Sequence, residues 1–473
     1  MDSLRGLTHG LRFGGGQDAR ATAIKIKQTV AQASSPALFL GNLNCLTMIN
    51  HQNPALDLMQ TSNKTTGQTT DRDAADIAVI GAGIAGLICA EQLRQAGYRV
   101  VVIEKSRGFG GRAATKRVPN FRADHGLRYL ERSGRLLPVL IDALCDRGLL
   151  QPWNVRFCRV TPEGTIAPEI PTKTPPETPP PNLNPIREII GINNDETLEN
   201  AMVSPQSLNL DQSQFRRYIA PTGANAIGKF LAQNLTVWRS RRAISLTPAG
   251  DRWQVQLEAV AEGIDAPLSL TARAIVVAVP APQASELIAA TETIAPEIQA
   301  AIAAVSYHPC ISVMAGYPAE LAETDRVWDS LQFEGDRDVF WAGVESTKRE
   351  ADRLMLTVHA APEFARDQFD APDLNAVGQI LLDRLTPHFP ALANHRPEFL
   401  AVHRWRYAFV DQPFDRDCLS TRSPLPLVFG GDWCGTAQAE TALRSGLAMA
   451  AEVTRSLDGR SMPTLGAMLA KLQ

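Results

Sequence analysis

A glycine-rich turn near residue 80 constrains the fold of this chain more than any other part of its sequence. Residues 77–80 form a short apolar run that predicts a buried strand, and Gly81-x-Gly83-x-x-Gly86 follows where a helical pattern begins. Gly81 permits a tight turn, Gly83 lets a pyrophosphate approach the backbone, and Gly86 lets the helix pack closely on the strand. Unpaired N–H groups at the helix N-terminus would then bind the anion. The turn therefore predicts the first strand and helix of a dinucleotide-binding unit.

The residues after this turn agree with that interpretation. Apolar residues continue at helical spacing to Ala96, Gly97 occupies the place of a C-terminal cap, and residues 99–103 predict a second buried strand that ends at Glu104. A carboxylate there can accept hydrogen bonds from both hydroxyls of an adenosine ribose. Because the residue is Glu and no arginine takes its role, a ribose without a 2′-phosphate is favoured. Both FAD and NAD fit the sequence at this point.

A second glycine-rich loop begins directly after Glu104. It contains Gly108, Gly110 and Gly111 with arginines on both sides, so it can wrap a pyrophosphate while Arg112 supplies charge-assisted hydrogen bonds. An ordinary surface turn is the alternative. The position of the loop, immediately after the expected ribose ligand, favours the phosphate-binding role.

The C-terminal part of the chain offers a complementary segment. Residues 427–429 predict a strand that ends at two glycines and Asp432, and residues 437–453 show the apolar spacing of a helix. We expect the positive end of this helix, near Thr441 and Ala442, to face the anionic edge of a reduced flavin. Asp432 would bind the ribityl or pyrophosphate region, or would only cap the helix. Together with the second glycine-rich loop, this segment favours FAD as the cofactor.

Composition argues against several other classes of function. The net charge is −3 at pH 7, and no basic stripe is present to bind nucleic acid. No apolar run reaches the roughly 20 residues that a membrane span requires. The seven cysteines are scattered and form no C-x-x-C pair, so neither a disulfide framework nor a zinc or other metal site is expected. This cysteine usage suits a reducing compartment, and a cytoplasmic protein is predicted.

Two stretches lack the pattern of folded elements. Residues 1–75 are rich in turn and linker residues, which predicts a disordered N-terminal extension; a processed leader and a later start at Met59 are the alternatives. Residues 161–187 are rich in proline, which excludes a helix or a central strand. We interpret them as an extended surface insertion, and a binding site for an SH3-type partner is the alternative.

The rest of the chain alternates between strands and helices. Strands are expected at residues 236–238, 253–257, 274–279, 311–315, 339–344 and 354–360, and helices at residues 136–149 and 374–385. We expect the first two of these strands to form a hairpin around Ala249-Gly250-Asp251.

These elements predict an α/β fold, α+β overall, in which a Rossmann-like FAD-binding domain is interleaved with an antiparallel-sheet substrate domain. The FAD-binding domain is assigned to residues 76–155, 215–285 and 425–473, and the substrate domain to residues 156–214 and 286–424. The sheet of the second domain should form a roof over the isoalloxazine.

Several motifs occur in one order along the chain and together resemble the renalase family, which belongs to the wider amine-oxidase-like flavoproteins. They are Gly81-x-Gly83-x-x-Gly86, Glu104, Gly110-Gly111-Arg112, Asp124-x-Gly126-x-x-Tyr129, Ala220-Pro221-Thr222-Gly223, Val279-Pro280, Val305-Ser306-Tyr307, His403-Arg404-Trp405-Arg406-Tyr407 and Gly430-Gly431-Asp432. The resemblance covers residues 76–457. The sequence departs from the family at the 161–187 insertion and at Glu345-Ser346-Thr347-Lys348, where bacterial relatives often have Asn-Ser-Ser-Lys.

The resemblance implies a cofactor and a reaction. Members of this family bind FAD without a covalent link and oxidise the 2- and 6-dihydro isomers of NAD(P)H to NAD(P)+. A hydride passes to flavin N5, and dioxygen reoxidises the flavin to give hydrogen peroxide. No cysteine occurs at residues 405–408, before the final glycines, where a covalent link would be expected. The implied partners are therefore a dihydronicotinamide and dioxygen.

The resemblance and the motifs also select candidate site residues. The candidate cofactor-binding residues are Gly81, Ala82, Gly83, Ala85, Gly86, Glu104, Lys105, Gly111, Arg112, Asp432, Thr441 and Ala442. Trp405 and Tyr407 are the candidate catalytic residues, because aromatic side chains can align a nicotinamide ring by stacking; core packing is the alternative for both.

Two other functions fit the same features. An FAD-dependent amine or carotenoid-type oxidoreductase would use the same cofactor frame. An amine oxidase should have a pair of aromatic residues beside the flavin, and only one member, near Tyr407, is evident in the sequence. A flavin-stabilised binding protein that recruits a partner through its proline-rich segment is the third hypothesis.

Overall fold

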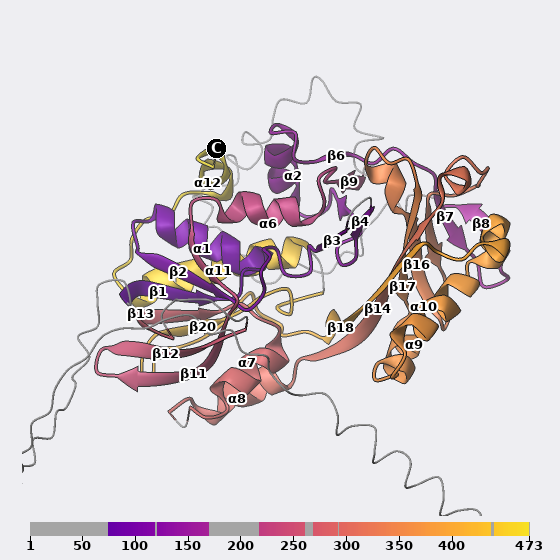
Figure 1. The fold of residues 1–473 in the computed structure, drawn as a ribbon. Coiled ribbons are helices and arrows are strands. Elements are labelled where there is room, and N and C mark those ends of the chain that lie inside the picture. Colours follow the sequence, from indigo (N-terminus) through magenta and orange to yellow (C-terminus); the bar gives the residue numbers. More distant parts are fainter. Residues whose placement is uncertain are drawn as a thin grey trace, which may run out of the picture. The chain divides into compact units, whose positions relative to one another are not determined.

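The computed structural model describes residues 74–118, 121–169, 217–260, 268–291, 293–436 and 439–472. These residues lie within one compact unit, Gly67–Gln473. The predicted N-terminal extension lies outside the described residues except for its last two positions, and the proline-rich segment lies outside them from residue 170 onward. Two large β-sheets, two small ones and the helices that cover them make up the described part (Figure 1).

The first sheet carries the glycine-rich turn. Its main strand order is β10-β2-β1-β13-β12-β11, with β20 paired to β13 and β19 paired to β20. The strands are β1 (Ala74–Ile80), β2 (Val100–Glu104), β10 (Thr236–Arg239), β11 (Arg241–Ala249), β12 (Arg252–Ala259), β13 (Ser269–Val277), β19 (Leu419–Thr421) and β20 (Leu427–Phe429). Pairing from β10 through β2, β1 and β13 to β20 is parallel. Parallel strands covered on both faces consist of continuous apolar runs, as residues 77–80 and 100–103 do.

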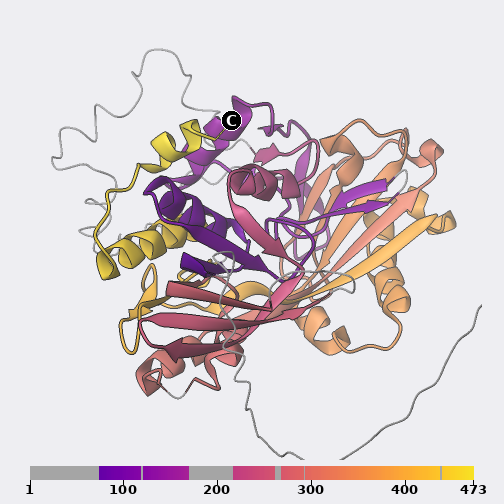
Figure 2. The same ribbon diagram turned by 60° about the vertical axis from the view of Figure 1, so that its left-hand side comes forward.

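Helices cover both faces of this sheet. They are α1 (Ile84–Gln95), α2 (Leu137–Cys145), α6 (Asn225–Ala232), α7 (Ala281–Ile288), α8 (Pro296–Ala303), α11 (Ala439–Ser456) and α12 (Leu465–Ala470). Side chains alternate along β1, so Val79 packs in the core with α1 and α11 while Ile80 packs in the core with α7. The helices α1 and α11 lie side by side (Figure 2, indigo and yellow), and a Cβ added to Gly446 would come within 2.6 Å of the Ala85 carbonyl oxygen. Close packing of these two helices brings the C-terminal segment to the glycine-rich turn.

The second sheet has the strand order β18-β14-β17-β16-β15-β7-β8. Its strands are β7 (Phe157–Val160), β8 (Ile166–Pro168), β14 (Ser306–Tyr317), β15 (Ser330–Phe333), β16 (Val339–Val344), β17 (Leu354–Ala360) and β18 (Phe399–Gln412). The helices α9 (Pro362–Gln368) and α10 (Leu374–Asp383) pack on one face in a core that includes Val358. The next residue, His359, has the opposite orientation and lines the cavity described below.

Smaller elements complete the described fold. They are the hairpin of β3 (Thr115–Val118) and β4 (Phe121–Asp124), the three-stranded sheet of β5 (Leu130–Glu131), β9 (Arg217–Ile219) and β6 (Gln151–Pro152), and the short helical turns η2 (Ala319–Leu321), η3 (Glu345–Lys348), η4 (Thr386–His388) and η5 (Pro390–Asn394). The segment from β4 to β5 runs over the cavity and carries several of its wall residues.

The predicted fold class is confirmed, because a Rossmann-like parallel sheet is interleaved along the chain with a second, largely antiparallel sheet. Two details differ. The partner of β12 in its hairpin is β11, whereas residues 236–239 form β10 and pair in parallel with β2. Four of the nine residues of β11 are polar and only two are buried, so its apolar pattern is weak. In the second sheet, β7 pairs in parallel with β15.

The short strand β8 lies within the proline-rich segment. It pairs with β7 at the edge of the second sheet. Proline is tolerated on an edge strand, because no further strand needs the N–H group that proline lacks. Among the described residues, no helix is both long and apolar enough to cross a membrane.

Candidate functional site

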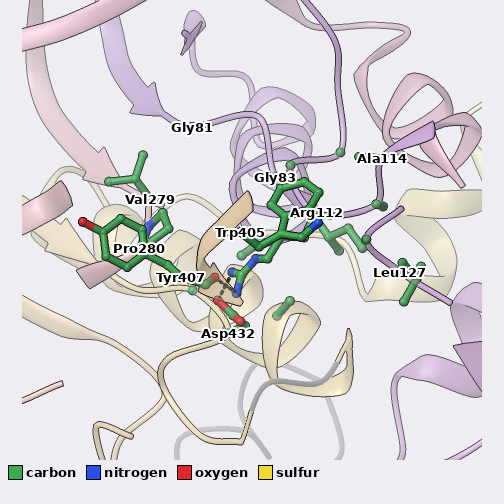
Figure 3. A pocket seen from close by; sticks show the side chains of 18 of the residues that line it. Gly81, Gly83, Arg112, Ala114, Leu127, Val279, Pro280, Trp405, Tyr407 and Asp432 are labelled. Atoms are coloured by element: carbon green, nitrogen blue, oxygen red, sulfur yellow. Dashed lines mark hydrogen bonds and ion pairs between the residues drawn. The ribbon is translucent and has the colours of Figure 1, made fainter. Parts of the chain in front are cut away.

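A cavity of about 1240 Å³ is lined by residues of both sheets. Its walls come from the turn between β1 and α1, the loop after β2, the segment between β4 and β5, strand β18, and the turn after β20 (Figure 3). A cavity for one drug-sized ligand is typically about 300–1,000 Å³, so this one has room for a dinucleotide and a second molecule.

Most of the predicted site residues meet at this cavity. The cavity wall contains Gly81, Gly83, Ala85, Glu104, Lys105, Gly111, Arg112, Trp405, Tyr407, Asp432 and Ala442. Three predicted residues lie outside the wall. The Ala82 N–H donates to Glu104, Gly86 packs against the Gly81 carbonyl, and Thr441 is buried beside Gly435. Cofactor binding by these three residues stays a prediction.

The three glycines of the first turn have different surroundings. Gly81 has a φ of +109°, and an added Cβ would lie 2.8 Å from the Ala278 carbonyl oxygen. A Cβ on Gly86 would lie only 2.1 Å from the Gly81 carbonyl oxygen. Gly83 has an ordinary φ of −74°, and an added Cβ would meet no atom within 4 Å. The protein itself therefore requires glycine at 81 and 86, whereas at Gly83 only a ligand in the cavity would require it.

Glu104 is buried at the end of β2 and holds the backbone of the turn. Its two carboxylate oxygens accept hydrogen bonds from the Ala82 N–H at 2.7 Å and from the Ser106 N–H at 2.8 Å. The oxygen that accepts from the Ser106 N–H also accepts from the Ser106 hydroxyl. Each carboxylate oxygen has two lone pairs, so the oxygen that accepts from Ala82 keeps one acceptor site for a ribose hydroxyl.

We expect Glu104→Ala to weaken FAD binding by about 10- to 100-fold, because hydrogen bonds to charged groups contribute about 1.5–3 kcal/mol. The flavin-to-protein absorbance ratio after gel filtration measures the retained FAD. Glu104→Gln is the matched control, because it keeps the shape of the side chain without its charge. Thermal unfolding of the apoproteins shows whether the backbone turn that Glu104 holds is destabilised, which separates that effect from loss of the ribose contacts. An unchanged flavin content in Glu104→Ala would contradict the ribose assignment.

Arg112 joins three segments of the chain at the cavity. Its guanidinium forms a 2.5 Å ion pair with Asp432 and donates to the carbonyls of Tyr407 at 3.1 Å and Ala408 at 3.3 Å (Figure 3). The predicted contact of Arg112 with a phosphate stays a prediction. The observed contacts give Arg112 and Asp432 a structural role, because they hold the loop after β2, strand β18 and the turn after β20 together at the cavity wall.

Trp405 forms an aromatic wall of the cavity together with two histidines. Its ring centroid lies 5.2 Å from that of His125 and 4.3 Å from that of His403, and its indole N–H donates to the His125 carbonyl at 2.8 Å. Burial lowers the pKa of His125 to about 4, with a smaller contribution from His403, and burial also lowers the pKa of His403. Both imidazoles are therefore neutral at pH 7. The sequence motifs did not identify these histidines as wall residues.

Tyr407 follows Trp405 by two residues on β18, so both side chains are on the same face of the strand. Its ring packs edge to face against Tyr307 at 5.5 Å, and it lies beside Pro280 at the cavity wall (Figure 3). The face of β18 that lines the cavity thus has two aromatic side chains, whereas only Tyr407 was expected as a member of such a pair.

Comparisons with known proteins agree with this geometry. Residues 79–143 match the model of an NAD(P)-binding Rossmann-like domain, and residues 186–454 match that of the flavin-containing amine oxidoreductases. The chain belongs to the flavin-containing amine oxidoreductase family. The second match covers more than half of the sequence and includes β9 to β20 as well as most of α11.

Solved structures show the same fold at low sequence identity. A double mutant of putrescine oxidase is similar over 81% of this chain and 99% of its own, with 16% identity and a TM-score of 0.56. Cyclohexylamine oxidase from Brevibacterium oxydans covers the same shares, with 17% identity and a TM-score of 0.56. At these identities the likeness establishes the architecture and leaves the substrate open.

The cofactor of this family member is FAD, and the cavity fits it. Gly83 with the open space beside it, Glu104 and the glycine-rich loop after β2 all line the cavity, which is what a bound dinucleotide requires. Among the described cavity residues the single cysteine is Cys310. Its buried thiol faces the carbonyls of Ile311 and Ala360, and burial raises its pKa to about 12. These residues therefore offer no reactive thiol for a covalent link to the flavin.

Proposed function

We propose that this flavoprotein oxidises 2- or 6-dihydro-NAD(P) to NAD(P)+, with dioxygen as the final electron acceptor. The observation that supports the proposal best is the charge of the described cavity wall. Seven basic side chains line it, Lys105, Arg112, Arg128, Arg241, Arg242, Arg404 and Arg406, against four acidic ones, Glu104, Glu131, Glu286 and Asp432. Such a wall attracts a phosphate-bearing substrate and repels a cationic amine.

The acidic residues of the wall are also engaged within the protein. Glu104 accepts from backbone N–H groups, and Glu131 pairs with Arg217 at 3.0 Å. Glu286 pairs with Arg242 at 3.1 Å, and Asp432 pairs with Arg112. Within the described wall, therefore, no carboxylate is left unpaired for a substrate ammonium group. An amine substrate would lose its hydration in the cavity without a counter-charge to replace it.

The aromatic wall suits the reaction that we propose. Bound FAD supplies the hydride acceptor, so the protein has to align a dihydropyridine ring and exclude water rather than move a proton. Trp405 and the neutral His125 are uncharged aromatic side chains at the cavity wall that could contact this ring. In this proposal Trp405 and Tyr407 act by stacking, which fits their positions on one face of β18.

Amine oxidation is the second candidate, and two observations favour it. Trp405 and Tyr407 could flank an amine as an aromatic pair, and the fold resembles that of putrescine and cyclohexylamine oxidases. The two candidates make opposite predictions about the charge of the substrate.

Anaerobic mixing of the purified yellow protein with each compound tests both candidates directly. We expect 2- or 6-dihydro-NAD(P) to bleach the flavin absorbance within seconds, and putrescine, cyclohexylamine and a polyene to leave it unchanged. Admission of air should restore the absorbance and release one hydrogen peroxide per substrate. Ordinary 4-dihydro-NADH is the matched control, because it differs only in the position of the added hydrogen. Bleaching by an amine and by none of the dihydronicotinamides would reject the proposal.

A further inference from the structure

We propose that Arg128 is the residue that selects the charge of the substrate, by binding a phosphate of the nicotinamide nucleotide. This inference rests on the proposed function and adds a specificity-determining residue to it. Arg128 lies between β4 and β5, in the segment that runs over the cavity, and its side chain lines the cavity wall.

The guanidinium of Arg128 is fixed by aromatic rings rather than by a carboxylate. Its central carbon lies 5.2 Å from the ring centroid of Tyr129, 5.0 Å from that of Phe340 and 5.6 Å from that of Trp341. One guanidinium nitrogen donates to the amide oxygen of Gln332 at 3.0 Å. An arginine has five N–H donors, so four remain without a partner among the described residues.

The backbone of Arg128 is held as firmly as its side chain. The buried ammonium of Lys348 donates to the Arg128 carbonyl at 2.8 Å. Gln332, which accepts from the guanidinium, donates in turn to the Phe340 carbonyl at 2.8 Å. The guanidinium is therefore held in place before a ligand arrives, which reduces the entropy that binding would cost.

Each of the other arginines of the described wall has a carboxylate or a backbone carbonyl as a partner. Arg112 pairs with Asp432, Arg242 with Glu286, Arg406 with Asp370, and Arg241 and Arg404 donate to the carbonyls of Ser240 and Phe369. Arg128 differs from them because its one described protein partner is a neutral amide. A phosphate offers the paired acceptors that suit a planar guanidinium.

The charge of Arg128 acts across the cavity. Burial lowers the pKa of His359 well below its usual value, and the positive charge of Arg128 contributes to this shift. His359 lines the wall on β17 and carries no positive charge at pH 7. Arg128, together with the buried Lys348, is thus a positive charge near a neutral histidine of the wall.

The test compares substrates that differ only in their phosphates. Dihydronicotinamide riboside has none, the mononucleotide has one, and 2- or 6-dihydro-NAD has two. We expect Arg128→Gln to lower kcat/KM for the mononucleotide and the dinucleotide by about 10- to 100-fold, as loss of a hydrogen bond to a charged group predicts. For the riboside, kcat/KM should change by less than about twofold.

Two further variants serve as controls for this test. Arg128→Lys keeps the charge and should give an intermediate loss of kcat/KM. Arg122→Gln removes an arginine at an exposed position nearby and should leave kcat/KM unchanged. Equal losses for all three substrates, or no loss for any, would overturn the role of Arg128.

A binding measurement separates this inference from the proposed function. NAD+ and nicotinamide riboside are titrated into the holoprotein, and the flavin absorbance reports binding. We expect NAD+ to bind wild type at least about tenfold more tightly than the riboside, and the difference to disappear in Arg128→Gln. If wild type oxidises no dihydronicotinamide but keeps this difference, the function fails and the phosphate site stands. If it oxidises all three substrates equally well in both proteins, the function stands and the site fails.

Discussion

Replacing Lys348 with Met is expected to lower the free energy of unfolding by about 3–5 kcal/mol, because it leaves buried carboxylates without their cation. Lys348 and Glu345 are both fully buried, and their charged groups lie 2.6 Å apart. Asp124 lies 3.9 Å from the same ammonium and forms a 2.7 Å ion pair with Arg349. The four side chains form a buried network that joins η3 to the end of β4.

The network also holds the backbone that runs over the cavity. Glu345 accepts from the Asp124 N–H at 2.9 Å, and Asp124 accepts from the Ala224 N–H at 2.9 Å at the start of α6. Lys348 donates to the carbonyl of Arg128. A weakened network should therefore displace the segment that carries His125 and Arg128, in addition to lowering stability.

Urea or thermal unfolding of wild type and variant measures the loss. Lys229→Met is the matched control, because Lys229 is exposed on α6 and its replacement should cost less than about 0.5 kcal/mol. The double variant Lys348→Met/Glu345→Gln removes both charges and should recover part of the loss. A loss below about 1 kcal/mol in Lys348→Met would mean that the network contributes little.

The loss should also depend on pH. Burial raises the pKa of Glu345 even with Lys348 beside it, and removal of Lys348 would raise this pKa further. A folded-state pKa above the unfolded value favours the folded state at low pH, and the advantage disappears as pH rises through the folded-state pKa. The difference in stability between Lys348→Met and wild type should therefore be larger at pH 8 than at pH 5.

The second large effect is expected at Gly83. Because a Cβ at this position meets no protein atom within 4 Å, Gly83→Ala should leave the apoprotein as stable as wild type, within about 0.5 kcal/mol. If a pyrophosphate lies against this glycine, the added methyl should weaken FAD binding by about 1–3 kcal/mol, or about 5- to 150-fold. Flavin released from the holoprotein and titration of the apoprotein with FAD both measure this change.

Gly86→Ala provides the contrast for this experiment. Its Cβ would lie 2.1 Å from the Gly81 carbonyl oxygen, so it should destabilise the apoprotein itself. Normal FAD affinity in Gly83→Ala would contradict the predicted position of the pyrophosphate, whatever the result at Gly86.

Regular strands could be predicted from the sequence because the apolar run that indicates each strand lies within the strand itself. Residues 339–344 and 354–360 are apolar runs, and their predicted limits agree with β16 and β17. Strand β11 was missed because four of its nine residues are polar and only two are buried. The pairing of residues 236–239 with β2 could not be predicted either, because nothing within that short stretch indicates its partner.

Only those site residues that belong to a recognisable sequence motif could be predicted. The glycines and Glu104 follow from the spacing of one strand, turn and helix, and the structure places Glu104 on the same wall as Gly81 and Gly83. The buried network was not predictable, since Asp124 and Glu345 are separated by 221 residues and each alone resembles a surface acid. Arg128 and His125 have no motif of their own, and only the folded structure shows which rings surround them.

The contacts of Arg112 connect cofactor binding to the completion of folding. Its partners Tyr407 and Asp432 are 295 and 320 residues away along the chain. Contacts of such long range form late, after most of the loop-closure entropy has been lost. The contacts of Arg112 with Tyr407 and Asp432 therefore cannot form on a growing chain until β18 and the turn after β20 have been synthesised. The part of the cavity wall that these residues form is absent until then. The yellow colour of bound flavin should thus distinguish fully folded molecules from those in which only the N-terminal Rossmann unit has formed.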